Sequence, residues 1–426
     1  MRLKDKVLFL FIGVGLLFIS LNRHSHHPIF NYHSQLFADK AGYHIYFPAW
    51  FYYDMDARNL PDSIALKTGQ GFWTEDSKIL TKYPIGVAVC QLPFSLIAAL
   101  ADKIYQVKGP LGFTNAHHLA LNWSTVIWGT LGLLLLFLTA IQFWNLTYSQ
   151  AYLLIFGVLI LSNLLYYTTR DCGMSHTYSF TVFAAIQHLI TRIQTSKKID
   201  NSSISFLLIL GSLAIVLRPI NLFFILTPLL YLLLHKNLWK EISINIQPSI
   251  LSVAIILAFL PISMQMSYNY YAFGKLIADG YVNESFSNIG EMNLLRLWFS
   301  PHNGVFIYSP ILLLAIIGVI KGWVNDNRWG VIYLFYFMTI SLTYASWWSP
   351  GLGCGFGHRG FTEHLAFFAM PISWVMKTIT KSQQRWWSVC FAIIGVLLFI
   401  VQYNFDGCWP EGRDWDWNLF FNYLKL

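Results

Sequence analysis

The sequence predicts an all-α polytopic membrane protein with about 11 transmembrane helices and further helices at the outer membrane surface. Apolar residues make up 56% of the 426-residue chain and charged residues only 11%, too few to cover the surface of a soluble domain. Apolar runs of roughly bilayer-spanning length recur from end to end. They cover residues 7–22, 84–102, 118–143, 149–168, 175–191, 204–217, 219–234, 249–271, 304–320, 329–346, 361–376 and 386–402.

Lysine and arginine gather in five clusters at the ends of these runs, and short loops rich in these residues stay in the cytoplasm. In order, the clusters are Arg2, Lys4 and Lys6; Arg192, Lys197 and Lys198; Lys236 and Lys240; Lys321 and Arg328; and Lys377, Lys381 and Arg385. If every run crosses, the first cluster lies opposite the other four. All five share one side if one run before residue 192 does not cross.

We expect the run 84–102 to be the one that does not cross. It starts at Pro84, contains Pro93 and ends beside Asp102 and Lys103, so we interpret it as a helix that dips into the outer leaflet. An ordinary span is the alternative, because the charge rule is statistical. The run 7–22 has no signal-peptide cleavage site after it and reads as an uncleaved anchor.

These assignments predict a multi-pass inner (plasma) membrane protein with a cytoplasmic amino terminus and one integral membrane domain, residues 1–426. The outer face receives the loop 23–117, which holds the interfacial helices, then 169–174, 272–303, 347–360 and the short tail 405–426. Functional groups therefore concentrate on the outer face. The net charge of +8 does not indicate nucleic-acid binding, because no basic helix or aromatic-basic motif accompanies it. The absence of a P-loop disfavours an ATP-driven pump.

The five cysteines form no CxxC motif, so neither a zinc site nor a redox motif is predicted. Cys172, Cys354 and Cys408 are expected on the outer face. A disulfide between two of them is one option, and buried free thiols are favoured.

Two charged residues stand out in the first outer loop. Asp39 precedes an aromatic stretch suited to an interfacial helix, where a carboxylate serves as general base, metal ligand or helix cap, and a cap or solvated residue is favoured. Lys82 opens the dipping helix, where it pairs with an anion or snorkels to anchor the helix.

Three further candidates lie at borders between apolar runs and the outer face. Asp171 sits in a very short outer turn and His176 begins the next run; a surface pair between Arg170 and Asp171 is the alternative. Arg218 precedes a proline between two short runs, and burying it there is costly unless an anion or carbonyl groups satisfy it. The alternative is an arginine that snorkels to the surface.

The strongest local signal is the glycine-rich segment 347–364, which carries His358 and Arg359. Glycines let the backbone approach a ligand closely, and the planar guanidinium suits a phosphate. A purely structural loop is the alternative.

In their order along the chain, these segments resemble the GT-C superfamily of membrane glycosyltransferases, and most of all the bacterial relatives of protein O-mannosyltransferases and lipid A aminoarabinose transferases. Asp39 matches the first acidic position of the family and Asp171 the second. Lys82-Tyr83-Pro84 matches its Lys/His-x-Pro motif at the start of a non-crossing helix. Motifs of bacterial members are resembled by Arg218-Pro219-Ile220-Asn221, Ser300-Pro301-His302-Asn303-Gly304 and Phe356-Gly357-His358-Arg359.

The resemblance implies transfer of a sugar from a polyprenyl-phosphate carrier to a lipid, glycan or protein acceptor at the outer (periplasmic) face. It implies Asp39 as general base, with Asp171 orienting the acceptor or the sugar. The donor phosphate would be held by Lys82, Arg218 and Arg359, and Tyr43, His176, His302 and His358 are secondary candidates for the substrate site.

The chain departs from this family in showing only the tail 405–426 in place of a large carboxy-terminal soluble domain. Lys40 also stands where a second acid is common, which disfavours a metal site at Asp39. No cofactor or metal site is predicted, and dependence on a divalent metal stays open. Two other functions stay open: a transporter or flippase for lipid-linked sugars, and a polymerase or ligase of surface polysaccharide.

Overall fold

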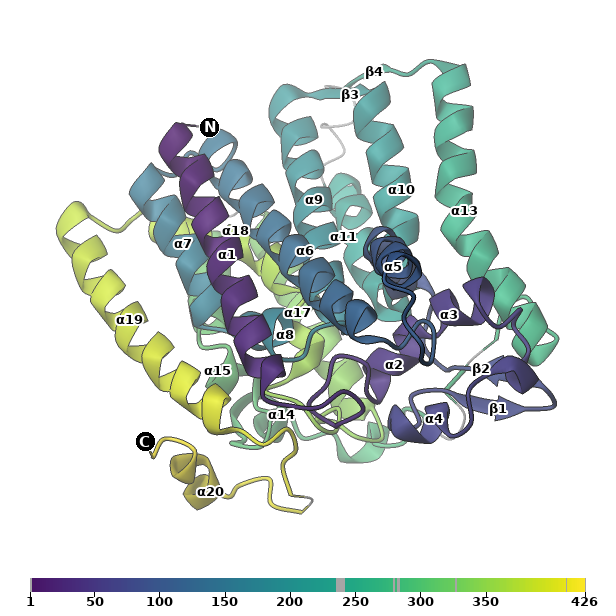
Figure 1. Cartoon of the computed structure of the whole chain (residues 1–426). Coiled ribbons are helices and arrows are strands. Elements are labelled where there is room, and N and C mark those ends of the chain that lie inside the picture. The colour runs from purple at the N-terminus through teal and green to yellow at the C-terminus, as the bar shows by residue number, and fades with distance from the viewer. Residues whose placement is uncertain are drawn as a thin grey trace.

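The computed structural model describes residues 2–234, 242–278, 280–281, 284–325, 328–410 and 412–425, and it is built almost entirely of helices (Figure 1). Its helices, 3-10 helices (η) and short strands are α1 (Leu3–Ser25), α2 (Asp39–His44), α3 (Tyr46–Phe51), η1 (Ala57–Asn59), α4 (Ile64–Lys67), β1 (Trp73–Glu75), β2 (Lys78–Leu80), α5 (Gly86–Ile104), α6 (Asn115–Gln142), α7 (Tyr148–Ile160), α8 (Leu164–Thr169), α9 (Ser175–Ser196), β3 (Lys198–Asp200), α10 (Asn201–Leu217), η2 (Pro219–Asn221), α11 (Leu222–Leu234), β4 (Ser243–Asn245), α13 (Pro248–Phe273), η3 (Ile289–Glu291), α14 (Leu294–Phe299), α15 (Val305–Tyr308), α16 (Ile311–Val324), α17 (Arg328–Ser346), η4 (Arg359–Phe361), α18 (Leu365–Met376), α19 (Lys381–Asn404) and α20 (Trp417–Asn422).

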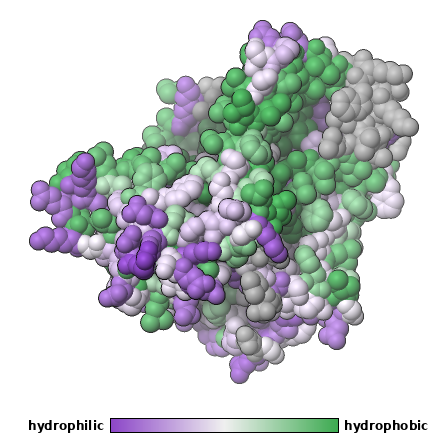
Figure 2. Space-filling view, turned by 90° about the vertical axis from the view of Figure 1, so that its right-hand side faces the viewer, coloured by the Kyte–Doolittle hydropathy of each residue, from purple (hydrophilic) through white to green (hydrophobic). Residues whose placement is uncertain are grey.

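Six of the described helices are long and apolar enough to cross a bilayer, namely α1, α5, α6, α13, α17 and α19, and several shorter apolar helices accompany them. Lipid rather than protein must cover much of their surface, because Ile256, Phe259 and Leu260 of α13 are each more than half exposed. Figure 2 shows the side of the molecule on which α13 lies, with apolar side chains over much of its upper part and hydrophilic ones gathered lower down. The predicted all-α polytopic membrane fold is confirmed.

Two predicted apolar runs are broken rather than continuous. The run 149–168 divides into α7 and α8 around Asn163, and the run 304–320 divides into α15 and α16 at Pro310. Asn163 is fully buried and its side chain accepts hydrogen bonds from Thr362 (3.0 Å) and Ser309 (3.3 Å). A buried amide must find such partners, so the break ties these three segments together.

The two ends of the helix bundle carry different elements. Figure 1 shows the amino terminus and the parallel pair β3–β4 at the upper end, and the antiparallel pair β1–β2, α2, α4 and α20 at the lower end. The predicted basic clusters at Arg2 and at Lys197 therefore lie at the same end, opposite the loop 23–117. The cluster of Lys236 and Lys240 lies outside the described residues.

The helix α5, predicted not to cross, runs across the bundle. Figure 1 views it nearly along its axis, whereas α1, α6, α10 and α13 extend lengthwise in the same view. A helix in the plane of the membrane needs this orientation, and the non-crossing assignment stays a prediction.

Cysteine labelling tests this topology. We expect Lys82→Cys and the exposed Lys108→Cys, which flank α5, both to react with a membrane-impermeant maleimide added from outside, because a non-crossing helix leaves its ends on one side. Lys197→Cys serves as the internal control and should react only after permeabilisation. Reaction of Lys108→Cys from the cytoplasm alone would establish α5 as a span.

The loop 23–117 has a core of its own, which fixes the position of α2. Its buried apolar members are Leu36, Ala41, Ile45, Ala49, Tyr53, Ile64, Phe72, Ile79 and Phe113, and Leu121 of α6 packs with them. Gly42 packs so closely on Gly71 and the Tyr83 ring that an added Cβ would overlap both, so only glycine fits this position of α2. The loop is thus a built platform that presents the first turn of α2 to the rest of the molecule.

The cysteine prediction is wrong in part. Cys354 and Cys408 form a disulfide that joins the glycine-rich segment to the tail, whereas Cys172 is a buried free thiol. Spacing gave no sign of this pairing, because the two positions are 54 apart in the sequence, with η4, α18 and α19 between them.

Candidate active site

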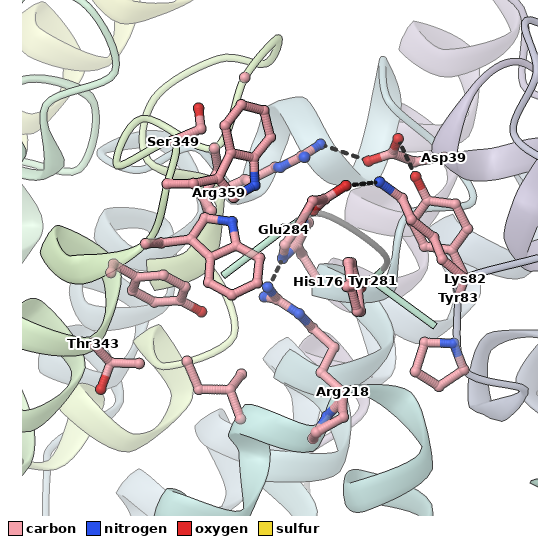
Figure 3. A pocket seen from close by; sticks show the side chains of 18 of the residues that line it. Asp39, Lys82, Tyr83, His176, Arg218, Tyr281, Glu284, Thr343, Ser349 and Arg359 are labelled. Atoms are coloured by element: carbon pink, nitrogen blue, oxygen red, sulfur yellow. Dashed lines mark hydrogen bonds and ion pairs between the residues drawn. The ribbon is translucent and has the colours of Figure 1, made fainter. Parts of the chain in front are cut away.

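A cavity of about 650 Å³ opens between the loop 23–117 and the helix ends near it, a volume typical of small-molecule sites. Segments from six regions line it: the start of α2, the stretch before α5, the start of α9, the α10–η2 junction, the segment between α13 and η3, and the end of α17 with the segment that follows it. Six of the predicted site residues lie on its wall: Asp39, Tyr43, Lys82, His176, Arg218 and Arg359 (Figure 3).

Asp39 is the first residue of α2 and points into this cavity. One carboxylate oxygen accepts a hydrogen bond from the Tyr83 hydroxyl at 2.5 Å, and the other accepts from Arg359 at 2.9 Å. Burial alone would raise the pKa of Asp39, but the charge of Arg359 and the Tyr83 hydrogen bond outweigh it and lower the pKa below its ordinary value. Asp39 is therefore a carboxylate at neutral pH, and 30% of its side chain stays exposed toward the cavity.

Lys82 reaches into the cavity from the segment before α5. Its ammonium forms an ion pair with Glu284 and lies 5.4 Å from the ring centres of Tyr83 and Tyr281. Glu284 was not predicted, because the residues 272–299 around it show no motif.

Arg218 enters the cavity where α10 ends. Its guanidinium forms an ion pair with Glu363 and lies 3.2 Å from Nδ1 of His176. The same nitrogen of His176 lies 2.9 Å from the second oxygen of Glu363. Glu363 is fully buried. Sequence reasoning missed it, although an acid inside the apolar run 361–376 is itself a signal of function.

Close backbone packing brings these segments together. Gly86 at the start of α5 lies against the backbone of Val216 and Leu217, where an added Cβ would overlap both. The Thr81 hydroxyl donates to the Gly42 carbonyl at 2.9 Å. Lys82 is thereby placed between α2, which carries Asp39, and the end of α10, which carries Arg218.

The glycine-rich segment shapes the opposite wall. Gly355 has φ of 151° and lies against the Tyr167 hydroxyl, 2.6 Å from an ideal Cβ position, so a side chain there would be strained and crowded. The disulfide at Cys354 and the Asn163 side chain, which donates to the His358 carbonyl at 3.3 Å, hold the segment on both sides of Gly355. Arg359 follows in η4 and projects toward Asp39 (Figure 3).

Three predicted site residues lie outside the cavity wall. His358 is buried beside Arg359, with Nε2 2.8 Å from the Pro350 carbonyl, and burial lowers its pKa to about 3. His302 lies 3.2 Å from Asp414.

Asp171 forms an ion pair with Lys40 at 2.8 Å. Lys40 follows Asp39 in α2, and consecutive residues of a helix point in different directions, so Lys40 meets Asp171 while Asp39 lies on the cavity wall. The alternative pair between Arg170 and Asp171 does not form, since Arg170 donates to the Gln402 carbonyl.

Among the described residues, no three His, Cys, Asp or Glu side chains gather closely enough to hold a metal ion. The cavity instead pairs each of its three cations with an acid. These pairs are Lys82 with Glu284, Arg218 with Glu363, and Arg359 with Asp39.

The helical bundle and the charged cavity at one of its ends define a polytopic membrane fold. The chain is similar to the crystal structure of ArnT from Cupriavidus metallidurans bound to undecaprenyl phosphate, with a TM-score of 0.57 and 9% sequence identity, over 100% of this chain and 69% of that one. At this identity the likeness establishes the fold. No protein-family profile matches the chain, and no curated protein matches it by sequence.

Proposed function

We propose that the protein transfers a sugar from a polyprenyl-phosphate carrier to an acceptor at the outer face of the membrane. One observation carries the proposal: within a GT-C fold, a single cavity is lined by a carboxylate, Asp39, and by the three cations Lys82, Arg218 and Arg359. Its wall is largely aromatic and aliphatic elsewhere, which suits a lipid-linked sugar. ArnT, which shares the fold, binds undecaprenyl phosphate in its crystal structure.

The cations fit the leaving group of this reaction. When the bond between sugar and phosphate breaks, the carrier phosphate gains one negative charge, and fixed cations stabilise that charge in a site sheltered from water. Arg218 and Arg359 supply planar donor arrays that match phosphate oxygens. In the absence of substrate, the paired acids keep the arginine side chains extended into the cavity, and a bound phosphate would then compete for the same guanidinium groups.

Asp39 and Arg359 couple the two halves of the reaction. The acceptor hydroxyl attacks the anomeric carbon and its proton passes to Asp39, which is a general base positioned on a built platform. Protonation removes the negative charge of Asp39. The charge of Arg359 is then no longer compensated, at the moment when the departing phosphate becomes more negative.

Aromatic side chains complete the cavity. Tyr43, Tyr281 and Trp347 lie on its wall, and such rings stack on the apolar faces of sugars or on isoprenoid units. The disulfide Cys354–Cys408 is typical of an oxidising compartment, which supports an outer-face site. The acceptor class, whether lipid, glycan or protein, follows from the assay below.

Asp171 receives a different role in this proposal, that of a positioning residue. Its partner Lys40 is 7% exposed and adjoins Asp39, so the ion pair anchors the first turn of α2. We expect Asp171→Asn to lower the transfer rate about tenfold and to lower thermal stability, because it leaves a mostly buried ammonium unpaired.

The double variant Lys40→Met/Asp171→Asn separates anchoring from substrate contact. It removes both charges, and we expect it to recover part of the rate and stability lost in Asp171→Asn. If Asp171→Asn retained normal stability and raised only the KM for the acceptor, Asp171 would contact the substrate, as the sequence resemblance implies.

The proposed function is tested with purified protein in vesicles, radiolabelled polyprenyl-phosphate sugars and an acceptor extract from the cell envelope. We expect label to move from the carrier into a lipid, glycan or protein fraction, which also identifies the acceptor. Movement of intact labelled carrier across the bilayer, without transfer, would reject the transferase and favour the transporter.

A further inference from the structure

The buried pair of Glu363 and His176 is not explained by phosphate binding alone. Glu363 is fully enclosed and His176 keeps only 2% of its side chain exposed, yet the histidine belongs to the cavity wall. Two ionisable groups are costly to bury unless they serve a purpose. Their geometry fixes which nitrogen of the ring carries the proton.

The separation of 2.9 Å between Nδ1 of His176 and an oxygen of Glu363 requires a hydrogen between them. Glu363 also pairs with Arg218 and is therefore a carboxylate, which only accepts hydrogen bonds. The hydrogen belongs to Nδ1. The contact at 3.2 Å between Nδ1 and Arg218 is then one of proximity, since both groups are donors.

The other nitrogen is left with a lone pair. A second positive charge beside Arg218 is disfavoured in a buried site, so the ring is neutral and Nε2 is an acceptor. Among the described residues, no group bonds to Nε2. Nε2 is also absent from the set of buried polar atoms that lack a partner, so the protein does not enclose it completely. The ring lies against Tyr167, with centres 5.0 Å apart, which holds it in place.

We propose that His176 is a hydroxyl-binding residue of this site and that Glu363 is the positioning residue that sets its tautomer. Nε2 accepts a hydrogen bond from a substrate hydroxyl, which belongs either to the sugar of the donor or to the acceptor. Glu363 performs a second task, since its other oxygen holds Arg218. The inference rests on the proposed transferase function for its kinetic test, and the tautomer itself is independent of it.

Two variants test the pair. His176→Phe keeps a flat ring and removes Nε2. Glu363→Gln keeps the shape, but its amide N–H facing Nδ1 favours the opposite tautomer, which turns Nε2 into a donor. Glu291→Gln, at an exposed position in η3, is the matched control and should behave as wild type.

We expect each variant to lower kcat/KM by roughly 10- to 100-fold, the worth of a buried hydrogen bond to a substrate hydroxyl. Because the two side chains act as one unit, the double variant should be little worse than the poorer single one. A raised KM for the donor alone assigns the hydroxyl to the sugar, and a raised KM for the acceptor alone assigns it to the acceptor. Additive losses in the double variant would overturn the proposal.

A binding and a spectroscopic readout keep this result distinct from failure of the transferase proposal. His176→Phe should retain the affinity of wild type for undecaprenyl phosphate, since Arg218 and Glu363 remain, and ¹⁵N NMR of labelled histidine should show Nδ1–H for His176 in the wild type and Nε2–H in Glu363→Gln. An Nε2–H tautomer in the wild type would reject the proposal, whatever reaction the protein catalyses. Wild-type protein with the Nδ1–H tautomer but no transferase activity would count against the proposed function instead.

Discussion

Replacing Asp39 with asparagine should lower the transfer rate by roughly 10²–10⁴-fold, the usual worth of general-base catalysis. The amide retains the shape and an acceptor for the Tyr83 hydroxyl, but it cannot take up the proton of the attacking hydroxyl. Donor binding should largely survive, because Lys82, Arg218 and Arg359 remain. Single-turnover rates and the affinity for undecaprenyl phosphate, measured in parallel, separate the two effects.

Asp62→Asn is the matched control for Asp39→Asn, because Asp62 is exposed in the same outer loop and should leave the rate unchanged. The lowered pKa of Asp39 also fixes the pH dependence. The base is lost only as pH falls through that lowered pKa, so the acid limb of the wild-type rate profile should lie below the ordinary carboxyl value of about 3.9. A wild-type rate in Asp39→Asn at equal membrane levels would remove Asp39 from the chemistry.

Replacing Arg359 with lysine should raise the KM for the donor and lower kcat, with a combined loss of roughly 10- to 100-fold in kcat/KM. Lysine retains the positive charge that Asp39 needs, so the change isolates the loss of the planar, two-pronged contact to phosphate. The effect should be measured for donor turnover and for binding of undecaprenyl phosphate. Both should weaken together, because the same contact serves the bound and the departing phosphate.

Arg296→Lys is the matched control for Arg359→Lys. Arg296 pairs with Asp414 at 2.8 Å and does not line the cavity, so its replacement should leave kinetics and binding as in the wild type. Unchanged donor affinity and turnover in correctly inserted Arg359→Lys protein would mean that Arg359 serves only to hold Asp39.

The sequence predicted the fold class because a helix that crosses a bilayer needs a long apolar run, and such runs can be recognised directly in the sequence. It also singled out Asp39, Lys82, Arg218 and Arg359, since these charged residues stand near apolar runs on the predicted outer face, in motifs that resemble those of a known family. The structure shows that these four side chains line one cavity, and their catalytic and binding roles stay predictions.

Other parts of the site were beyond a reading of the sequence for definite physical reasons. Glu363 is hidden in an apolar run, and Glu284 stands in a loop without periodicity. Asp171 was placed with the substrate on the family resemblance alone, and the sequence does not reveal that Lys40 of α2 pairs with it. The break at Asn163 depends on hydrogen bonds to Ser309 and Thr362, partners remote in sequence.

The bond between Cys354 and Cys408 has a consequence for biogenesis. The segment that carries Arg359 is tied covalently to the stretch after α19, so this wall of the cavity is not locked until that stretch has been translated. Covalent closure of this wall therefore follows the synthesis of α19 and needs oxidation of the two thiols. A chain truncated before Cys408 would lack this covalent lock, and non-covalent contacts alone would then hold the segment that carries Arg359.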